Sequence, residues 1–375
     1  MGRLAIFFAI VHVAGASCAG KPVGSLSPGA GGGAGSSGGA PGGAGASGGR
    51  RGGGGGVGGV SAGGTGVLGG AAGTGGGAGG DVTRPDAGVA QSPIVPQRLR
   101  GELRDSPLGV QTATPRLSWE LAAAGGARGL TQSAYEVLVA TSPEVLASGQ
   151  GDLMATGLIA SSEQRTVYSG KALASLAHVY WKVRVRDQGG ALSAWSAPAE
   201  LTVGLLAVSD WSAQWISGAP TGPLPLFRKE LAVAKPVKRA LLAICGLGQY
   251  EVRVNGTNAS DAVMEPPWTN YAKACDYAIY DVTPLLAQGR NAVGVLLGNG
   301  MYNVTASSRY AKFTGSFGAP KMILRLGVEY ADGTSSSLVS DTSWKTAPGP
   351  ITFTNVYGGE DFDARKEPAG WDRAG

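Results

Sequence analysis

The chain has 375 residues, a formal net charge of +5 and 65 glycines, and these properties are unevenly distributed. Thirty-two of the glycines lie between residues 20 and 80, where large apolar and charged residues are few, so the Gly/Ala/Ser-rich segment 19–93 is predicted to be a disordered linker. Beyond residue 94 there are 26 Lys and Arg residues against 24 Asp and Glu residues and no basic run interleaved with aromatics, which argues against a nucleic-acid partner.

Residues 1–18 have the pattern of an export signal. Arg3 is followed by an apolar core that is too short to span a bilayer as a mature helix. The small residues before Cys18 are similar to a bacterial lipobox, although Gly15 stands where an aliphatic residue is usual. We therefore expect an exported bacterial protein, either a cell-surface lipoprotein held to the membrane only through a lipid on Cys18, or a soluble secreted protein cut after Ala16. The absence of processing is the third alternative.

Beyond the linker the chain has strand and turn signals and almost no helical periodicity. In residues 181–186 three large apolar residues alternate with three cations, as in a half-solvated antiparallel strand. Short strands at this spacing predict a β-sandwich. Through Pro115-Arg116-Leu117-Ser118-Trp119, Tyr180-Trp181-Lys182-Val183-Arg184-Val185 and Ser193-Ala194-Trp195-Ser196, residues 97–204 resemble a fibronectin type III-like domain. We expect Trp119 and Trp181 in its core, and the cations either facing solvent or stacked against Trp195.

Residues 211–375 carry the signals of a second antiparallel domain. Residues 249–254 alternate and end in Asn255-Gly256, the strongest short hairpin signal. Apolar or alternating runs recur at 292–297 and 322–330, each next to a turn. The order predicts a jelly roll of galactose-binding-like type, so the folded part of the chain is expected to be all-β.

A series of short motifs runs through the folded region, and no single one is diagnostic. They are Thr114-Pro115-Arg116-Leu117-Ser118-Trp119, Ser193-Ala194-Trp195-Ser196, Asp210-Trp211-Ser212-Ala213-Gln214-Trp215, Val254-Asn255-Gly256, Pro267-Trp268-Thr269-Asn270-Tyr271, Gly298-Asn299-Gly300-Met301-Tyr302 and Tyr357-Gly358-Gly359-Glu360-Asp361-Phe362. In this order they resemble the N-terminal part of bacterial α-L-rhamnosidases of glycoside hydrolase family 78.

The resemblance implies the accessory β domains of an enzyme that removes terminal α-L-rhamnose by inverting hydrolysis. In that family two carboxylates on a later (α/α)6 barrel do the chemistry. The barrel would have to follow Gly375, so no residue of this chain inherits a catalytic role, and whether the chain is itself an enzyme stays open. The last residues, Gly370-Trp371-Asp372-Arg373, resemble the start of the family's next segment and suggest truncation. A fragment, a frameshift and a genuine short protein would all give this pattern.

Two kinds of partner follow from the resemblance. They are a rhamnose-containing glycan or glycoside and the missing catalytic domain. The alternative is a stand-alone surface lipoprotein that binds carbohydrate.

Four aromatic residues in turn-rich parts of the second domain are candidates for sugar binding: Trp268, Tyr271, Tyr302 and Tyr310. A flat ring at the end of a jelly roll can stack on the face of a pyranose. The alternative is that these rings pack the loops onto the core.

An acidic group near the end of the chain comprises Glu360, Asp361 and Asp363. Adjacent residues on a strand point to opposite faces, so Asp361 and Asp363 would share a face and could hold a cation such as Ca²⁺. The alternatives are a structural loop paired with Arg365 or Lys366, and a role at the interface with the missing catalytic domain. No metal site is assigned and no cofactor is expected, because neither histidine has a partner at metal-ligand spacing.

Two cysteines remain once Cys18 is set aside. In an oxidising compartment Cys245 and Cys275 could form one disulfide. The alternative is that both are small buried apolar residues, which the apolar strand before Cys245 favours.

Overall fold

The computed structural model describes residues 8–11, 91–218 and 222–375. Cys18 and most of the expected signal segment and Gly-rich linker lie outside these residues. The described part is all-β, as predicted, with several antiparallel sheets and one short helix, α1 (Pro143–Ala147).

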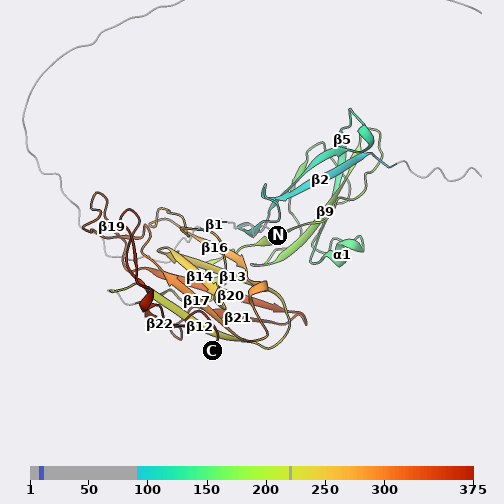
Figure 1. Cartoon of the computed structure of the whole chain (residues 1–375). Helices are drawn as coiled ribbons and strands as arrows, with labels where there is room; N and C mark the ends of the chain where they lie inside the picture. Colours follow the sequence, from blue (N-terminus) through green and yellow to red (C-terminus); the bar gives the residue numbers. More distant parts are fainter. Residues whose placement is uncertain (1–7, 12–90, 219–221) are drawn as a thin grey trace, which may run out of the picture. The chain divides into compact units, whose positions relative to one another are not determined.

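Two sheets make up the region from residue 94 to residue 203 (Figure 1). One has the order β3-β10-β9-β5-β6 with β7 beside β5, and the other has the order β2-β4-β8. All pairs are antiparallel except β3 with β10. The strands are β2 (Ile94–Gly101), β3 (Leu108–Val110), β4 (Arg116–Ala123), β5 (Gln132–Ala140), β6 (Met154–Ala155), β7 (Ile159–Ala160), β8 (Arg165–Val167), β9 (His178–Asp187) and β10 (Ala199–Val203).

The core of this region forms as the alternation predicted. Trp119 and Trp181 are both buried, and the indole nitrogen of Trp119 donates a hydrogen bond to Gln132 Oε1 at 3.0 Å. On the outer face of β9, the cations of Lys182 and Arg184 lie 4.9 and 4.7 Å from the ring centre of Trp195. The predicted stacking of cations on Trp195 is therefore present.

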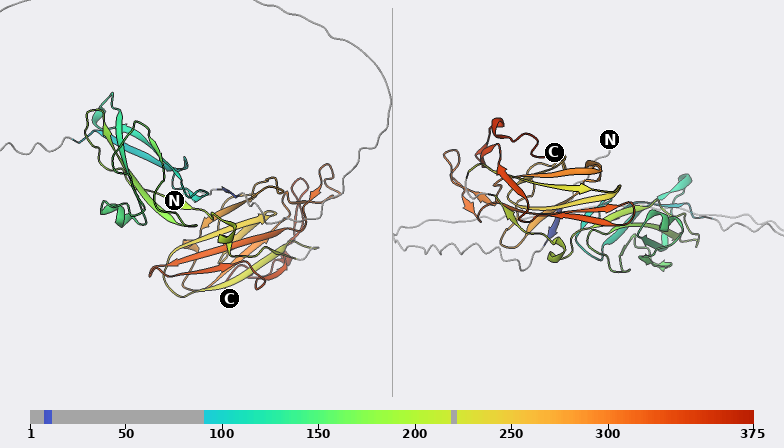
Figure 2. Two further views of the ribbon diagram at one scale, coloured as in Figure 1. Left: turned by 180° about the vertical axis from the view of Figure 1, so that it is seen from behind. Right: turned by 90° about the horizontal axis from the view of Figure 1, so that it is seen from below.

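The second region also has two main sheets, and its strands lie in two layers in the right-hand view of Figure 2. One sheet has the order β1-β16-β13-β20-β11 with β21 beside β20, and the other has the order β15-β14-β17-β12-β22. The strands of the first sheet are β1 (Phe8–Val11), β11 (Ile216–Ser217), β13 (Val237–Leu247), β16 (Cys275–Asp281), β20 (Lys321–Tyr330) and β21 (Ser335–Val339). Those of the second are β12 (Pro225–Val233), β14 (Tyr250–Val254), β15 (Thr257–Asn258), β17 (Gly289–Leu297) and β22 (Lys345–Pro348).

The apolar faces of these two sheets meet in one core. Leu242 and Ile244 from β13 lie in the same buried cluster as Val252 from β14 and Val293 and Val295 from β17. These residues alternate along their strands, so their neighbours point outward. The outward-facing side of the β12–β14–β17 sheet consequently carries charged residues as well as leucines.

The predicted hairpin at Asn255-Gly256 joins β14 to β15. Both turn residues have positive φ, 51° and 81°, as the tight mirror-image turn of a twisted hairpin requires. The Asn255 side chain also donates to Leu285 O at 2.9 Å and to Asn291 Oδ1 at 2.7 Å, and it accepts from Ala292 N at 2.9 Å. Asn255 therefore links the turn to the start of β17.

Two small hairpins lie beyond the main sheets. One consists of β18 (Asn303–Val304) and β19 (Gly315–Ser316), and the other of β23 (Ile351–Asn355) and β24 (Gly359–Phe362). Figure 1 places β19 at one extremity of the second region. A 3₁₀ turn, Ala364–Lys366, follows β24.

Candidate functional site

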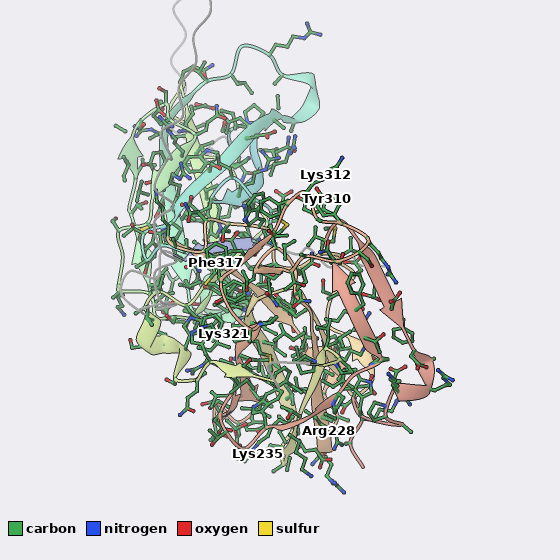
Figure 3. All side chains as sticks on the ribbon, turned by 90° about the vertical axis from the view of Figure 1, so that its left-hand side faces the viewer. Arg228, Lys235, Tyr310, Lys312, Phe317 and Lys321 are labelled. Carbon is green, nitrogen blue, oxygen red and sulfur yellow. The ribbon has the colours of Figure 1, made fainter. Side chains whose placement is uncertain are left out.

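Exposed aromatic side chains gather in the loops around β19. We call the group Trp268, Tyr310, Phe313, Phe317 and Tyr357 the aromatic end. Trp268 is 62% exposed, Phe317 52% and Tyr357 49%, which is unusual for rings of this size. Figure 3 shows Tyr310 and Phe317 at this end of the region, away from Arg228 and Lys235.

Four rings of the aromatic end contact one another in sequence, and the fifth, Phe317, packs on the rings of Tyr271 and Tyr302. Trp268 and Phe313 have centroids 6.4 Å apart, and Phe313 and Tyr357 have centroids 6.1 Å apart, both edge to face. Tyr310 stacks on Tyr357 at 4.7 Å. These separations are within the range of favourable aromatic pairs, so three loops present one connected surface.

Two of the four predicted sugar-binding residues lie beneath this surface. Tyr271 and Tyr302 are 7% and 3% exposed and pack with Leu247, their ring centroids 5.2 Å apart. Tyr302 Oη donates to Phe317 O at 3.1 Å, and burial raises the pKa of Tyr271 to about 12. These two rings attach the loops to the core, which was the alternative interpretation of the sequence.

Of the other two predicted residues, Trp268 belongs to the exposed surface, and Tyr310 is partly exposed and stacks on Tyr357. Trp268 lines a hollow of about 510 Å³ together with Tyr271, Met301, Phe313 and Phe317. Sequence reasoning missed Phe313, Phe317 and Tyr357 as members of this surface. They occur in loops without periodicity, so no local signal separated them from ordinary loop aromatics.

The acidic group falls into three separate environments. The carboxylate of Asp361 accepts two hydrogen bonds from Arg309 Nη2, at 2.9 and 2.7 Å. The Asp363 carboxylate accepts from Arg365 Nε and Nη2 at 2.8 and 2.9 Å, and these hydrogen bonds lower its pKa. Glu360, on the opposite face of β24, has no ion pair among the described residues.

Each of the two aspartates is thus neutralised by its own arginine. A calcium ion would have to displace both arginines, because carboxylate oxygens are the ligands that it needs. No group of three or more His, Cys, Asp or Glu side chains in the described part is arranged for a metal.

The two cysteines are neighbours on adjacent strands. Cys245 on β13 is buried, Cys275 on β16 is partly buried, and no disulfide joins them. A hydrogen bond from Cys245 lowers the pKa of Cys275. The structure thus brings the predicted pair together without a disulfide.

A buried hydrogen-bond network was not predicted from the sequence. Tyr280 donates to the carboxylate of Glu265, and the hydroxyl groups of Tyr280 and Tyr250 are 3.1 Å apart. Glu265 is 4% exposed, and burial raises its pKa. The sequence showed Glu265 only as one more acid in a loop before Pro266.

The comparisons with known proteins agree with this architecture. Residues 235–375 match the family model described as the α-L-rhamnosidase N-terminal domain, and residues 96–207 match the Rha78A-like N-terminal immunoglobulin domain. An α-L-rhamnosidase of Formosa agariphila is 35% identical over 297 residues, which cover 72% of this chain and 31% of that protein.

Two solved structures extend the comparison. The α-L-rhamnosidase from Dictyoglumus thermophilum superposes with a TM-score of 0.67 at 38% identity, over 76% of this chain and 33% of that chain. The Streptomyces avermitilis α-L-rhamnosidase in complex with L-rhamnose gives 0.68 at 23% identity, over 75% and 44%, and shows the shared fold. The chain spans about a third of the length of the curated relative from Formosa agariphila. In the described part, no helix is both long and apolar enough to cross a membrane.

Proposed function

Because this chain carries the N-terminal immunoglobulin-like domain and the rhamnosidase N-terminal domain of α-L-rhamnosidases of glycoside hydrolase family 78, we propose that it is the accessory region of an enzyme that removes terminal α-L-rhamnose by inverting hydrolysis. The catalytic domain is not covered by this chain. The observation that carries the proposal is that both β regions of this chain match α-L-rhamnosidases, over about a third of the length of those proteins.

The accessory role would be to hold and orient the catalytic portion. Inverting hydrolysis requires a protonated acid and a second carboxylate that activates water, roughly 6.5–9.5 Å apart. We place a fibronectin type III-like sandwich at residues 97–204 and a galactose-binding-like jelly roll at residues 211–375. We propose that the aromatic end forms part of the contact with further domains, because contiguous exposed rings mark interaction surfaces.

Hydrolysis of a chromogenic α-L-rhamnoside tests the proposal. The chain alone should show no turnover, whereas the chain joined to the catalytic portion of a homologous α-L-rhamnosidase should release the chromophore. Turnover by the chain alone would place the catalyst within these residues. A soluble, folded fusion without activity would count against the accessory role.

The second candidate is a stand-alone carbohydrate-binding lipoprotein, and the exposed rings of the aromatic end favour it. Micromolar binding of a rhamnoside by the chain alone would support this function over the first. Only millimolar binding is expected from the accessory region, since a sugar of this size gains little affinity from a single open surface.

Export is part of both functions. We propose that residues 1–18 direct export and that Cys18 carries the lipid. Labelled palmitate should enter the wild-type chain expressed in a bacterium and should not enter a Cys18→Ala variant. Equal labelling of the two would exclude Cys18 as the attachment site.

A further inference from the structure

A groove of about 550 Å³ crosses the outward-facing side of the β12–β14–β17 sheet, apart from the aromatic end. Its floor contains Leu226 from β12 and Leu296 from β17. Its walls come from the loop before β16, from the β23–β24 hairpin and from the C-terminal segment. A hollow of this volume matches the space that proteins use for small-molecule ligands.

Two side chains of the groove, Arg253 and Trp371, are held in place by further contacts. Arg253 is paired with Glu251 and with Asp372, each at 3.3 Å, and its guanidinium lies 5.7 Å from the ring centre of Trp371. The indole nitrogen of Trp371 in turn donates to Glu367 Oε1 at 3.2 Å. Sites whose polar groups are fixed in this way lose less entropy when a ligand binds.

Trp371 reaches the sheet because Gly294 has no side chain. A Cβ atom at position 294 would lie 2.7 Å from Cζ3 of Trp371, closer than atoms of a packed ring allow. The C-terminal segment that forms this wall is therefore packed against β17 through Trp371.

The charges of the groove select against an anion. Glu251, Glu360 and Glu367 are exposed carboxylates, and Arg253 is the cation among them. Carboxylates accept hydrogen bonds from hydroxyl groups, and the arginine can donate to a ring or hydroxyl oxygen. Next to these groups the groove is lined by Leu226, Leu296 and Ile351, of which Leu296 is partly exposed and the other two are buried.

Two residues that line the groove also keep unsatisfied polar atoms. Arg253 Nε and Glu265 Oε1 are buried and have no hydrogen-bond partner within the described structure. Such atoms are rare in folded proteins and occur where a ligand, a water molecule or a functional role explains them. They are two of six such atoms among the described residues, and the other four belong to residues that do not line the groove: Trp181, Arg228, Asp276 and Arg325.

We propose that this groove binds a neutral 6-deoxyhexose, the chemical class of L-rhamnose, with its hydroxyl groups toward Glu251, Arg253 and Glu360 and its methyl group on the floor of Leu226 and Leu296. The choice of L-rhamnose rests on the proposed function. The groove itself favours a ligand with hydroxyl donors beside an apolar edge.

Saturation-transfer NMR on the full chain tests the groove, with methyl α-L-rhamnoside as the probe. Millimolar affinity is expected, since a sugar of this size gains little binding free energy on an open site. Transfer should be strongest at the C6 methyl group. L-mannose, which differs from L-rhamnose by a hydroxyl group on C6, should bind at least about fivefold more weakly, because that hydroxyl would be buried against leucines.

Matched variants locate the ligand. Glu360→Gln and Glu251→Gln should each weaken binding about three- to tenfold, since each loses a charged hydrogen-bond acceptor. Glu163→Gln, an exposed acid outside the second region, should change nothing. If Trp268→Ala abolishes the signal while the groove variants do not, the sugar binds at the aromatic end and the proposal is wrong.

Two further results would overturn the proposal: no saturation transfer at any soluble sugar concentration, and equal affinity for L-mannose. Its failure is distinguishable from that of the proposed function. An active fusion whose accessory chain shows no rhamnoside binding refutes the groove alone, and binding by the chain combined with an inactive fusion refutes the accessory role alone.

Discussion

Glu265 has the lowest exposed fraction of the acids that the structure describes, and it is held by Tyr280 rather than by a cation. Its pKa is raised above the unfolded value of 4.5, and burial is the largest cause. The folded protein therefore binds this proton more tightly than the unfolded chain does. The stability it contributes is present below pH 4.5 and is lost as the pH rises through the folded-state pKa.

Glu265→Gln should remove this loss, because the amide oxygen can still accept from Tyr280 and carries no charge. The unfolding free energy of the variant, relative to wild type, should increase between about pH 4.5 and pH 8, by about 1.4 kcal/mol for each unit by which the pKa is raised. Urea unfolding of both proteins at the two pH values measures this difference. The contribution of acids whose pKa values are lowered cancels, because the variant and the wild type both contain them. Parallel pH profiles for the two proteins would contradict the prediction.

The cysteine pair gives a second prediction at this scale. Ile244 pairs with Ala278, so Cys245 continues opposite Tyr277, and Cys275 is its diagonal neighbour. Diagonal Cα atoms lie about 7–8 Å apart, beyond the usual disulfide range of about 4.4–6.8 Å. We expect both thiols to stay reduced in the purified chain.

Alkylation in denaturant, with and without prior reduction, should modify the same number of thiols in a Cys18→Ser background. A thiol that reacts only after reduction would show that β13 and β16 can move together far enough to form the bond.

Individual residues were predictable where a strand pattern governs them. The burial of Trp181 and the side of the cations facing Trp195 followed from alternation, which fixes the side of the sheet on which each residue lies, and the burial of Trp119 followed from the fibronectin type III-like motif. Glu265 was not predictable, because its burial depends on loops that return from distant positions. The same is true of Tyr271 and Tyr302, whose burial is set by packing between loops and not by any local period.

At the scale of the elements, the turn at Asn255-Gly256 was the most reliable sequence signal. The structure shows that Asn255 has two roles in it. Asn255 supplies a positive φ and three hydrogen bonds with a single side chain. Asn291, one of its partners, is fully buried. Turn formation and attachment of β17 therefore depend on the same residue.

Asn255→Gly separates these two contributions, because glycine keeps the turn conformation and loses the side-chain hydrogen bonds. The variant should be less stable by about 2–4 kcal/mol, since it leaves buried polar groups without partners. Asn255→Asp keeps the acceptor for Ala292 N but turns the donor contacts to Leu285 O and Asn291 Oδ1 into contacts between acceptors, so it should be at least as destabilised as the glycine variant. Chemical denaturation measures all three proteins, and an unchanged midpoint for the glycine variant would show that only the turn conformation matters.

Strand existence came from the sequence far more readily than strand pairing. The signals at 249–254, 292–297 and 322–330 correspond to β14, β17 and β20, yet no pattern indicated that β17 lies between β14 and β12. Pairing between distant strands is decided by the common core, which involves all of them at once. The outer groove depends on that pairing, and so it was not predicted.

For the whole molecule, we expect the aromatic end to govern the association of the isolated chain in solution. Contiguous exposed rings of this extent usually mark an interaction surface. The chain should self-associate with increasing concentration, and more strongly at high salt, because the association is apolar.

The double variant Trp268→Ser with Phe313→Ser should weaken this association about tenfold or more, equivalent to about 1.4 kcal/mol. Sedimentation velocity over a concentration series gives the constants. Val208→Ser, an exposed apolar residue outside the aromatic end, should associate as the wild type does. Unchanged association in the double variant would contradict the prediction and show that other surfaces mediate it.

The exposure of Trp268 also has an optical consequence. Of the eight tryptophans, five are less than 10% exposed, and Trp268 exceeds Trp215, which is 37% exposed. Its indole should emit at longer wavelength than the others and should be the one most readily quenched by acrylamide. A domain or glycan that covers the aromatic end would shift that emission to the blue and protect it from the quencher. A ligand confined to the outer groove would leave it unchanged, so the native fluorescence of the chain distinguishes occupancy of the two surfaces without any attached label.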